Sequence, residues 1–457
     1  MSRARHNDPH DTSPITPDFL PAGTPVSRPS LAPSSRSQVP DFQVMTILGR
    51  VAELRAAGAD VVSLCAGEPS GGAPAAVSAK AAEVHASGRP LNYTSTLGIS
   101  ELREAIAGHY RRWYGVEIDP RRVAVTTGSS GAFMAGFLCA FNPGDRVALA
   151  RPGYAAYRNI LSALGCQVVE LDAGPEVRFQ PTPALLDEAE ARHGPLAGLI
   201  LASPNNPTGT MVTRDEMEEL ATWCREHQVR LVSDEIYHGI TYADTAGETR
   251  GGARGSAVGG AVRDTGGGTA DVVPGGPQDA RGVCAAEYSP EAIVISSFSK
   301  YWGMPGWRIG WMLMPEDLVP AVGGLSGSVS LCPPAPAQYA AVEAFSADSY
   351  AECDAQVAGF ARARALLLEN QDRLGWTHAA PADGAFYFWA QPGEAMLATY
   401  GTSTAYCEAL LEGAHVALTP GTDFDTANGE KYVRLSFAAG YDAVAAGIER
   451  IVAFQRG

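Results

Sequence analysis

The sequence predicts an α/β fold in which a mostly parallel sheet is covered by helices on both faces. Short apolar runs recur along the chain, and each has the composition of a buried strand: VAVTTG, DRVALA, CQVVEL, AGLILAS, VRLVSD and AIVISS. Helical patterns such as residues 100–114 and 214–228 accompany them. Near-continuous Val/Ile/Leu strands separated by helices are typical of a parallel sheet that is buried on both faces.

The composition fits a globular protein with a sizeable core, and it limits the partners. Of 457 residues, 46% are hydrophobic and 18% are charged, and the formal net charge is −16. A nucleic-acid backbone requires a basic surface, so we expect no nucleic-acid partner. No apolar run reaches the roughly 18 residues of a membrane helix, and the N-terminus lacks the apolar stretch of a signal peptide. We therefore expect a water-soluble, cytoplasmic protein with no membrane partner.

The cysteines indicate neither a disulfide framework nor a zinc site. All eight are scattered, no two have C-x-x-C spacing, and the histidines do not cluster. Reduced thiols and no metal site are the expectation. His6, His10 and Asp11 could supply metal ligands, but they lie in a segment that is expected to be too flexible to hold an ion.

Two segments have the composition of flexible chain. Residues 1–40 are rich in Pro, Ser and Thr and show no periodicity, which predicts a disordered tail because little apolar surface is available to offset the entropy of ordering. Residues 246–282 are dense in glycine, but no strand precedes them and no helix start follows, which disfavours a phosphate-binding loop. We expect a flexible surface insertion there, with a lid over the site as the alternative.

Polar and small residues follow four predicted strands, at the carboxyl ends where such sheets bind ligands. Gly128-Ser129-Ser130-Gly131 follows VAVTT and starts an apolar helix, so it could hold a phosphate; an ordinary helix N-cap is the alternative. PNNPTG follows AGLILAS and can fix an asparagine amide at the sheet edge. The remaining candidates are Asp234 and Tyr237 after VRLVS, and Ser297, Ser299 and Lys300 after AIVIS, with Arg308 beyond. For Asp234, capping of a following helix is the alternative.

Lys300 is one of only three lysines, and since Lys and Arg together number 34, the other 31 positive charges are arginines (34 − 3). It follows a buried strand and lies among aromatic residues, whereas a lysine without such a context is a solvated surface charge. Burial near another cation lowers the pKa of an amine and frees its lone pair, as a Schiff base with a carbonyl requires. An arginine cannot lose its proton in this way. The position therefore needs a nucleophilic nitrogen.

With these residues in place, the chain resembles the class I/II aminotransferases, which are fold-type I enzymes that depend on pyridoxal 5′-phosphate. SPNNPTG, SDEIY and SFSKYWGMPGWRIG carry the resemblance, which extends from about Val39 to the C-terminus and is broken only by the insertion. It implies a large domain with a mostly parallel seven-stranded sheet and a smaller α+β domain. The implied division is an N-terminal segment at 41–80 that joins the small domain, a large cofactor domain at 81–330, and a C-terminal small domain at 331–457.

The resemblance implies a role for each candidate around the cofactor. Lys300 would form the Schiff base and move the proton at the substrate Cα, and Asp234 would keep the pyridine nitrogen protonated. Tyr237 would bond the ring oxygen together with the amide of Asn206. Tyr154 would stack on the ring, with a core tyrosine as the alternative. The residues that would hold the phosphate are Ser129, Ser130, Ser297 and Arg308.

The resemblance also implies an L-amino acid and a 2-oxo acid as substrates, and a homodimer. Tyr93, in LNYTSTLG, would reach the phosphate of the neighbouring subunit. Arg434, in KYVRLSFA, would clamp the substrate α-carboxylate, although a surface ion pair is the alternative for an arginine taken alone. Gly67 and Asn206 would border the same substrate. Side-chain specificity does not follow from the resemblance, because SGGAP stands after GEP where many relatives have an acidic or aromatic residue.

Three other interpretations compete with transamination. Ser297 to Lys300 fits the S-x-x-K nucleophile motif of serine β-lactamases, but that fold needs a K-T-G strand, and the other lysines, Lys80 and Lys431, stand in SAKAA and GEKYV. A cofactor-sensing regulator would need an N-terminal DNA-binding domain of roughly 70 residues, which the Pro/Ser tail cannot supply. β-Lyases and decarboxylases share most of the cofactor residues; Arg434 favours transamination, because it retains the α-carboxylate.

Overall fold

The central sheet has seven strands in the order β2-β8-β7-β6-β5-β3-β4. The structure is a computed structural model and describes residues 31–40, 42–242 and 281–456. The strands are β2 Val123–Thr126, β3 Arg146–Arg151, β4 Gln167–Asp172, β5 Gly198–Ala202, β6 Arg230–Asp234, β7 Ile293–Ser297 and β8 Gly310–Leu313. Neighbouring strands are parallel except at β8, which runs antiparallel to both β2 and β7. The predicted α/β fold with a mostly parallel seven-stranded sheet is confirmed.

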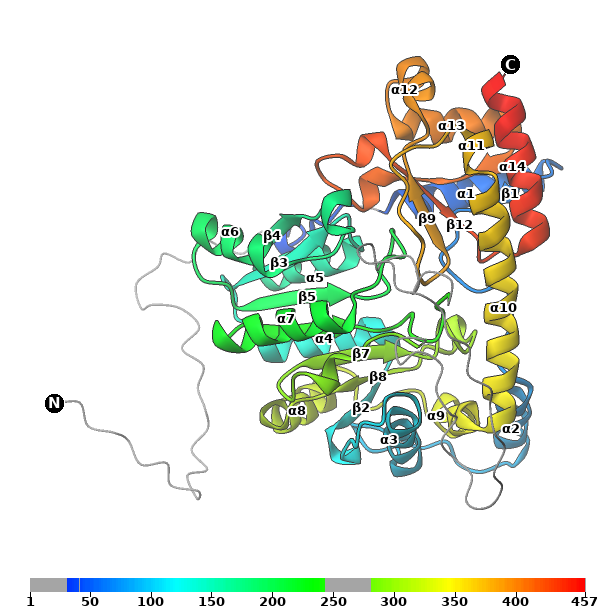
Figure 1. Ribbon diagram of the computed structural model, residues 1–457. Coiled ribbons are helices and arrows are strands. Elements are labelled where there is room, and N and C mark those ends of the chain that lie inside the picture. Colours follow the sequence, from blue (N-terminus) through cyan, green and yellow to red (C-terminus); the bar gives the residue numbers. More distant parts are fainter. Residues whose placement is uncertain (1–30, 41, 243–280, 457) are drawn as a thin grey trace, which may run out of the picture.

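Alternate strand residues face two helical layers, as the pleat of a strand requires. In β5, Leu199 and Leu201 belong to one apolar cluster and Ile200 belongs to the other. Helices that bury residues in the first cluster are α3 Ser100–Tyr114, α6 Pro183–His193, α7 Arg214–Glu226 and α9 Ala335–Ala341. Those in the second are α4 Gly128–Ala140, α5 Ala155–Leu164 and α8 Val319–Val329. Figure 1 shows these helices on both sides of the sheet.

The helix boundaries follow local signals in the sequence. Helix α3 covers the predicted range 100–114, and it ends at Gly115, whose φ of 70° suits a glycine. Helix α7 begins at a capping box between Thr213 and Glu216. Helix α4 starts at Gly128, so the small residues at 128–131 form its first turn and present backbone amides at the edge of the sheet.

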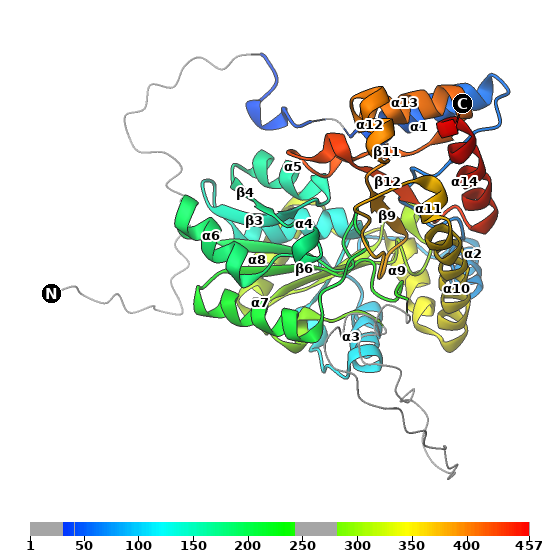
Figure 2. The ribbon, with the colours of Figure 1, turned by 45° about the horizontal axis from the view of Figure 1, so that its top comes forward.

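A second group of elements joins the two ends of the described chain (Figure 2). Its strands are β1 Val62–Ser63, β9 Tyr387–Ala390, β10 Val416–Ala417, β11 Thr419–Pro420 and β12 Val433–Ser436. Its helices are α1 Gln43–Ala56, α2 Ala75–Ala86, α10 Ala347–Glu369, α11 Gln371–Leu374, α12 Glu394–Tyr400, α13 Ser403–Ala414 and α14 Tyr441–Arg456. β1 pairs with β10, and β12 lies between β11 and β9. The segment that contains β1 therefore pairs with the C-terminal part of the chain, and the division into domains stays a prediction.

The two segments predicted to be flexible fall mostly outside the described residues. Residues 1–30 and 243–280 are not described, so the disordered tail and the insertion stay predictions. Residues 31–40 are described and exposed, with a short 3-10 helix at Ser35–Ser37. Arg281 and Gly282, the last residues of the predicted insertion, are described and packed against the fold.

Candidate active site

Lys300 lies in the turn after β7, at the carboxyl edge of the sheet. Its Nζ donates a hydrogen bond of 2.6 Å to the backbone oxygen of Gly67, and it lies 5.7 Å from the centre of the Tyr237 ring. Burial lowers the pKa of the amine to about 8, with a partly opposing effect from the carboxylate of Glu68. A neutral amine is therefore accessible near physiological pH, which the predicted nucleophile requires; the role itself stays a prediction.

Asp234 ends strand β6, beside β7, and its side chain is almost fully buried. Its carboxylate accepts hydrogen bonds from the Tyr157 hydroxyl and from the backbone N–H of Ile236 (3.1 Å). Burial raises the pKa of Asp234 to about 6, while the two hydrogen bonds favour the charged form. Sequence reasoning missed Tyr157, which lies in the first turn of α5, three residues after the N-cap residue Tyr154.

Replacing Tyr157 by phenylalanine is expected to move the acidic limb of the pH–activity profile to higher pH. The hydroxyl stabilises the ionised form of Asp234, so its loss raises the pKa of that carboxyl above its value of about 6. Steady-state kcat/KM between pH 5 and 8 measures the shift. Tyr406→Phe is the control: it removes a buried hydroxyl that accepts a hydrogen bond from Gln455 (2.8 Å) in the C-terminal part of the chain. It should leave the acidic limb of the pH–activity profile unchanged. An unmoved limb in Tyr157→Phe would contradict the assigned contact.

Tyr237 and Tyr387 form a pair of buried phenols beside Lys300. Their hydroxyl oxygens are 2.8 Å apart. A Cβ on residue 67 would lie 2.6 Å from the Tyr387 hydroxyl oxygen, so a glycine is required there. Sequence reasoning missed Tyr387, because it stands in the buried aromatic strand FYFWA, where nothing local distinguishes a site residue from a core residue.

Arg434, on β12, is a buried arginine that closes the other side of the site. Its guanidinium donates to Asn206 Oδ1 (2.9 Å) and to the backbone oxygen of Cys65 (2.7 Å). It also lies between the rings of Tyr387 and Phe424, at 4.5 and 4.7 Å from their centres. Its Nε is buried without a hydrogen-bond partner among the described residues. A buried cation with an unsatisfied donor is suited to an anionic ligand.

A third group of polar side chains meets the N-terminus of α4. Ser129 and Ser130 are in the first turn of the helix, where backbone amides are free. The Arg308 guanidinium stands directly over this turn: a Cβ on Gly128 would lie 2.5 Å from its Nη2. Ser297 is buried and contacts the hydroxyl of Ser299 at 2.8 Å. Helix amides, hydroxyls and an arginine fork together suit a phosphate dianion.

The last two candidates differ in where the structure places them. Tyr154 is half-buried, and its ring contacts Tyr157 edge-on (5.5 Å between centres) and Phe42 face-on (6.0 Å). Tyr93 is 80% exposed, and no hydrogen bond or ring contact joins it to the residues around Lys300. The structure therefore brings together predicted residues from seven separate segments of the chain and leaves Tyr93 on the surface.

Comparison with known proteins identifies the family of this chain. Residues 59–450 match the family described as aminotransferase class I and II. The chain belongs to this family. A valine–pyruvate aminotransferase of Mycobacterium tuberculosis is 43% identical over 417 residues, which cover 91% of this chain and 96% of that protein. An aspartate/prephenate aminotransferase of Thermus thermophilus is 31% identical, over 89% and 94% of the two chains.

Solved structures support the same conclusion. The crystal structure of an aminotransferase from Mycobacterium tuberculosis has a TM-score of 0.80 and 42% identity, over 93% of this chain and 100% of that one. Aspartate aminotransferase from Thermus thermophilus with maleate has a TM-score of 0.78 and 30% identity, over 93% and 99%. This protein is therefore an enzyme that moves an amino group between an amino acid and a 2-oxo acid, and the β-lactamase and regulator interpretations are set aside.

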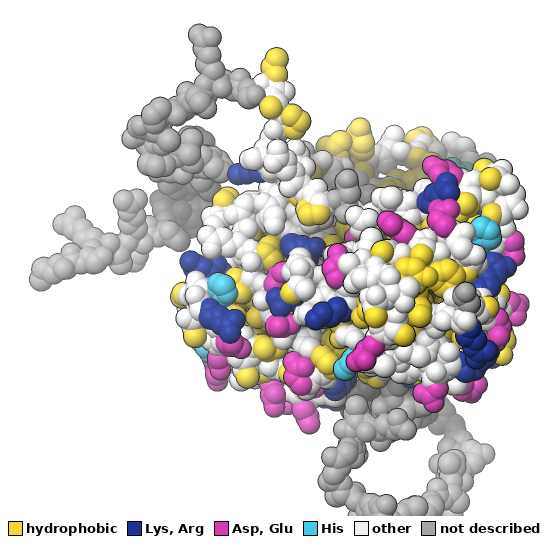
Figure 3. Space-filling view, turned by 90° about the horizontal axis from the view of Figure 1, so that it is seen from above, with side chains coloured by type: hydrophobic (Ala, Val, Ile, Leu, Met, Phe, Trp, Pro, Cys, Tyr) yellow, Lys and Arg dark blue, Asp and Glu magenta, His cyan; other side chains and the backbone are white. Residues whose placement is uncertain are grey.

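No described helix is long and apolar enough to cross a membrane. Within the described ranges, no three His, Cys, Asp or Glu side chains are arranged to hold a metal ion. On the face drawn in Figure 3, the described Lys and Arg side chains are interspersed with Asp and Glu and do not form one basic field.

Proposed function

We propose that this aminotransferase binds pyridoxal 5′-phosphate at Lys300 and transfers the amino group of a neutral aliphatic L-amino acid to a short 2-oxo acid. The cofactor proposal rests on two groups of residues in the site, one that suits the phosphate and one that suits the pyridine nitrogen. Arg308 over the first turn of α4 suits the phosphate, and the buried carboxylate of Asp234 suits a protonated pyridine nitrogen. When bound, the cofactor supplies an electron sink for the charge left by the substrate Cα proton.

Each protein group then has a task that its surroundings allow. With its pKa lowered to about 8, Lys300 can take up and return the proton at the substrate Cα. Asp234, held by Tyr157, would supply the negative charge that keeps the pyridine nitrogen protonated. Tyr237, whose hydroxyl contacts that of Tyr387, and the amide of Asn206 would bond the ring oxygen.

We infer that Arg434 binds the substrate carboxylate. Its guanidinium is flanked by two aromatic rings, so only its edge can accept a ligand, and the edge of a guanidinium matches a carboxylate with two parallel hydrogen bonds. Asn206 supports it from the other side at 2.9 Å. Because the carboxylate is held and retained, transamination is favoured over decarboxylation.

Arg434→Lys is expected to lower kcat/KM for every good substrate by about 1–3 kcal/mol in transition-state terms, because a point charge replaces a bidentate contact. Cofactor content, measured by absorbance, should stay at the wild-type level. Arg230→Lys, at a partly exposed ion pair with Asp317, is the matched control and should change neither quantity. Unchanged kcat/KM in Arg434→Lys would make Arg434 a structural residue.

The substrate proposal rests on the 43% identity to the valine–pyruvate enzyme over 91% of this chain. A panel that pairs L-valine, L-alanine, L-aspartate and L-glutamate with pyruvate and 2-oxoglutarate tests it by following 2-oxo acid formation. Valine with pyruvate should exceed aspartate with 2-oxoglutarate by at least about tenfold in kcat/KM. A preference for the acidic donors would overturn the substrate class but not the transaminase activity.

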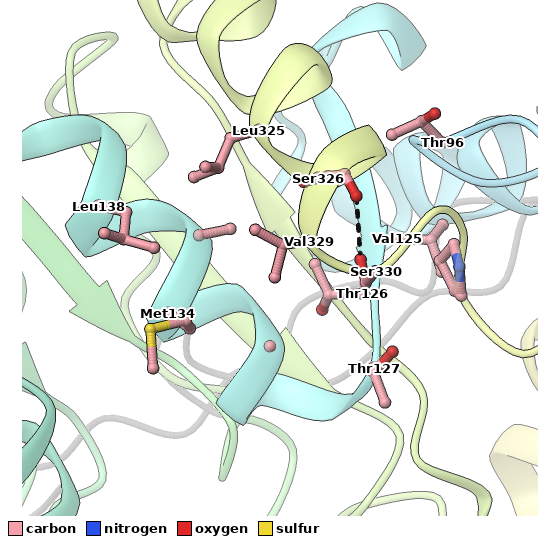
Figure 4. A pocket seen from close by; sticks show the side chains of 13 residues that line it. Thr96, Val125, Thr126, Thr127, Met134, Leu138, Leu325, Ser326, Val329 and Ser330 are labelled. Atoms are coloured by element: carbon pink, nitrogen blue, oxygen red, sulfur yellow. Dashed lines mark hydrogen bonds between the residues drawn. The ribbon is translucent and has the colours of Figure 1, made fainter. Parts of the chain in front are cut away.

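We further propose a homodimer in which Tyr93 completes the neighbouring site. Ten large apolar side chains of the described residues are exposed. Three of them, Met134, Leu138 and Val329, line one pocket between α4 and α8 (Figure 4). An apolar surface of this kind beside the first turn of α4 suits a second copy of the chain.

Mixing two inactive variants tests this proposal. If Tyr93 acts in the partner's site, a hybrid of Lys300→Ala and Tyr93→Ala chains has one site with both residues intact. Activity should then return in the mixture to about a quarter of wild type, since half of the chains form hybrids and each hybrid holds one whole site. No recovery, or a monomer in sedimentation velocity, would contradict the proposed arrangement.

A further inference from the structure

Arg281 contacts residues of the two loops that contain Lys300 and Tyr237. It is the first described residue after the gap at 243–280, and its side chain contacts Trp113 of α3 and Asp354 of α10. Its Nη1 and Nη2 donate to the two carboxylate oxygens of Asp354, on α10, at 2.6 and 2.9 Å. The same guanidinium lies 4.9 Å from the centre of the Trp113 ring and 5.9 Å from that of Tyr301.

The first link to the site passes through Tyr301, which directly follows Lys300. Its side chain is buried, and its hydroxyl donates to Asp354 Oδ1 at 2.7 Å. One carboxylate therefore holds both Arg281 and Tyr301. Since Lys300 and Tyr301 are consecutive residues of one turn, fixing the phenol of Tyr301 also fixes the backbone from which the Lys300 amine projects.

The second link passes through Gly239, two residues after Tyr237. Its backbone N–H donates to the backbone oxygen of Arg281 at 2.9 Å. Gly239 has φ +86°, and a Cβ there would lie 2.5 Å from Trp113 and 2.7 Å from Tyr301. The loop after Tyr237 is therefore packed against the same rings that Arg281 covers.

The ion pair itself contributes little to stability. The side chains of Arg281 and Asp354 are 33% and 44% exposed, and pairs in contact with solvent are weak. A bidentate geometry, in contrast, fixes direction as well as distance. Loss of the pair should therefore leave the fold intact and loosen the two loops.

We propose that Arg281 is a positioning residue that, with Asp354, clamps Tyr301 and the loop after Tyr237 and so holds the Lys300 amine and the Tyr237 phenol in their working arrangement. The expected effect of the clamp on kcat rests on the proposed function. The clamp itself is a property of the chain and can be measured without substrate.

The test compares Arg281→Met, Asp354→Asn, the double variant and Arg281→Lys, with Arg230→Met as the control for a partly exposed ion pair elsewhere. Arg281→Met should lower kcat by about tenfold or more, as small misplacements of reacting groups do. It should also move the pH midpoint of the cofactor absorbance and speed amide exchange in residues 298–304, with cofactor content unchanged. The kcat of the double variant should be no lower than that of either single variant. Arg281→Lys should have a higher kcat than Arg281→Met, because it keeps the positive charge.

Either of two results would overturn the clamp. The first is an Arg281→Met variant whose kcat, absorbance midpoint and amide exchange all equal those of the wild type. The second is a double variant whose fold-loss in kcat equals the product of the two single fold-losses. Amide exchange is read on the purified full chain without substrate. Faster exchange at 298–304 in a protein whose wild type shows no transamination would therefore support the clamp and count against the proposed function. Unchanged exchange in an active enzyme would count against the clamp alone.

Discussion

Lys300→Arg is expected to lower kcat by about 10⁶-fold, the order lost when a catalytic nucleophile is removed. Arginine keeps the positive charge and can still reach the oxygen of Gly67, which the Lys300 amine contacts at 2.6 Å. It cannot lose its proton at working pH, so it can neither bond to a carbonyl carbon nor take up the substrate Cα proton. Steady-state turnover with the best donor and acceptor measures the loss.

The other two lysines provide matched controls for this substitution. Lys80 is on the surface and forms an ion pair with Glu83 at 2.9 Å, and Lys431 stands in a short 3-10 helix before β12. Lys80→Arg and Lys431→Arg should keep wild-type turnover, because an exposed lysine needs only its charge. Comparable turnover in Lys300→Arg would show that the amine is not the reacting group.

Asp234→Asn is expected to lower kcat on the order of 10² or more, as removal of one preorganised electrostatic partner does. The asparagine fits the same buried space: its one oxygen can keep the bond from Ile236, and its Nδ2 can donate to the Tyr157 hydroxyl. It carries no negative charge to hold a protonated pyridine nitrogen. The cofactor should still bind, because its phosphate is held by the separate group at α4.

A control for this variant is Asp187→Asn, which keeps an acceptor for the Trp223 Nε1 (2.8 Å) on a helix outside the site. Its turnover should match the wild type. If Asp234→Asn also retained wild-type turnover at pH 7, another group would have to pair with the ring nitrogen.

The sequence predicted the sheet and most of the candidate site, because both depend on local patterns. Buried parallel strands are continuous apolar runs whose carboxyl ends meet at one edge, so the residues that follow the strands were expected at that edge. The pairing of β6 with β7, which the sequence did not predict, brings Asp234 and Lys300 close together. Strand β8 was not among the predicted runs: GWML has only four residues and follows directly on the turn that contains Lys300. Its antiparallel direction follows from the absence of a crossover helix between β7 and β8.

Residues that act through tertiary contacts could not be read from the chain. Tyr387 reaches Tyr237 across a sequence separation of 150 residues, and its strand reads as ordinary core. Arg281 stands at the end of a glycine-rich stretch predicted to be flexible, and only the position of α10 gives it a partner in Asp354. For Tyr93, whose side chain is 80% exposed, the expected partner is a second copy of the chain.

The most direct test of the central claim is reduction of the purified protein with borohydride, followed by proteolysis and mass spectrometry. Borohydride fixes a covalent linkage between a lysine and pyridoxal phosphate, and the chain offers only Lys80, Lys300 and Lys431 as sites. The account predicts the modification on the peptide that contains Lys300, with loss of the visible absorbance. Modification at Lys80 or Lys431, or no modified peptide after incubation with the cofactor, would contradict it.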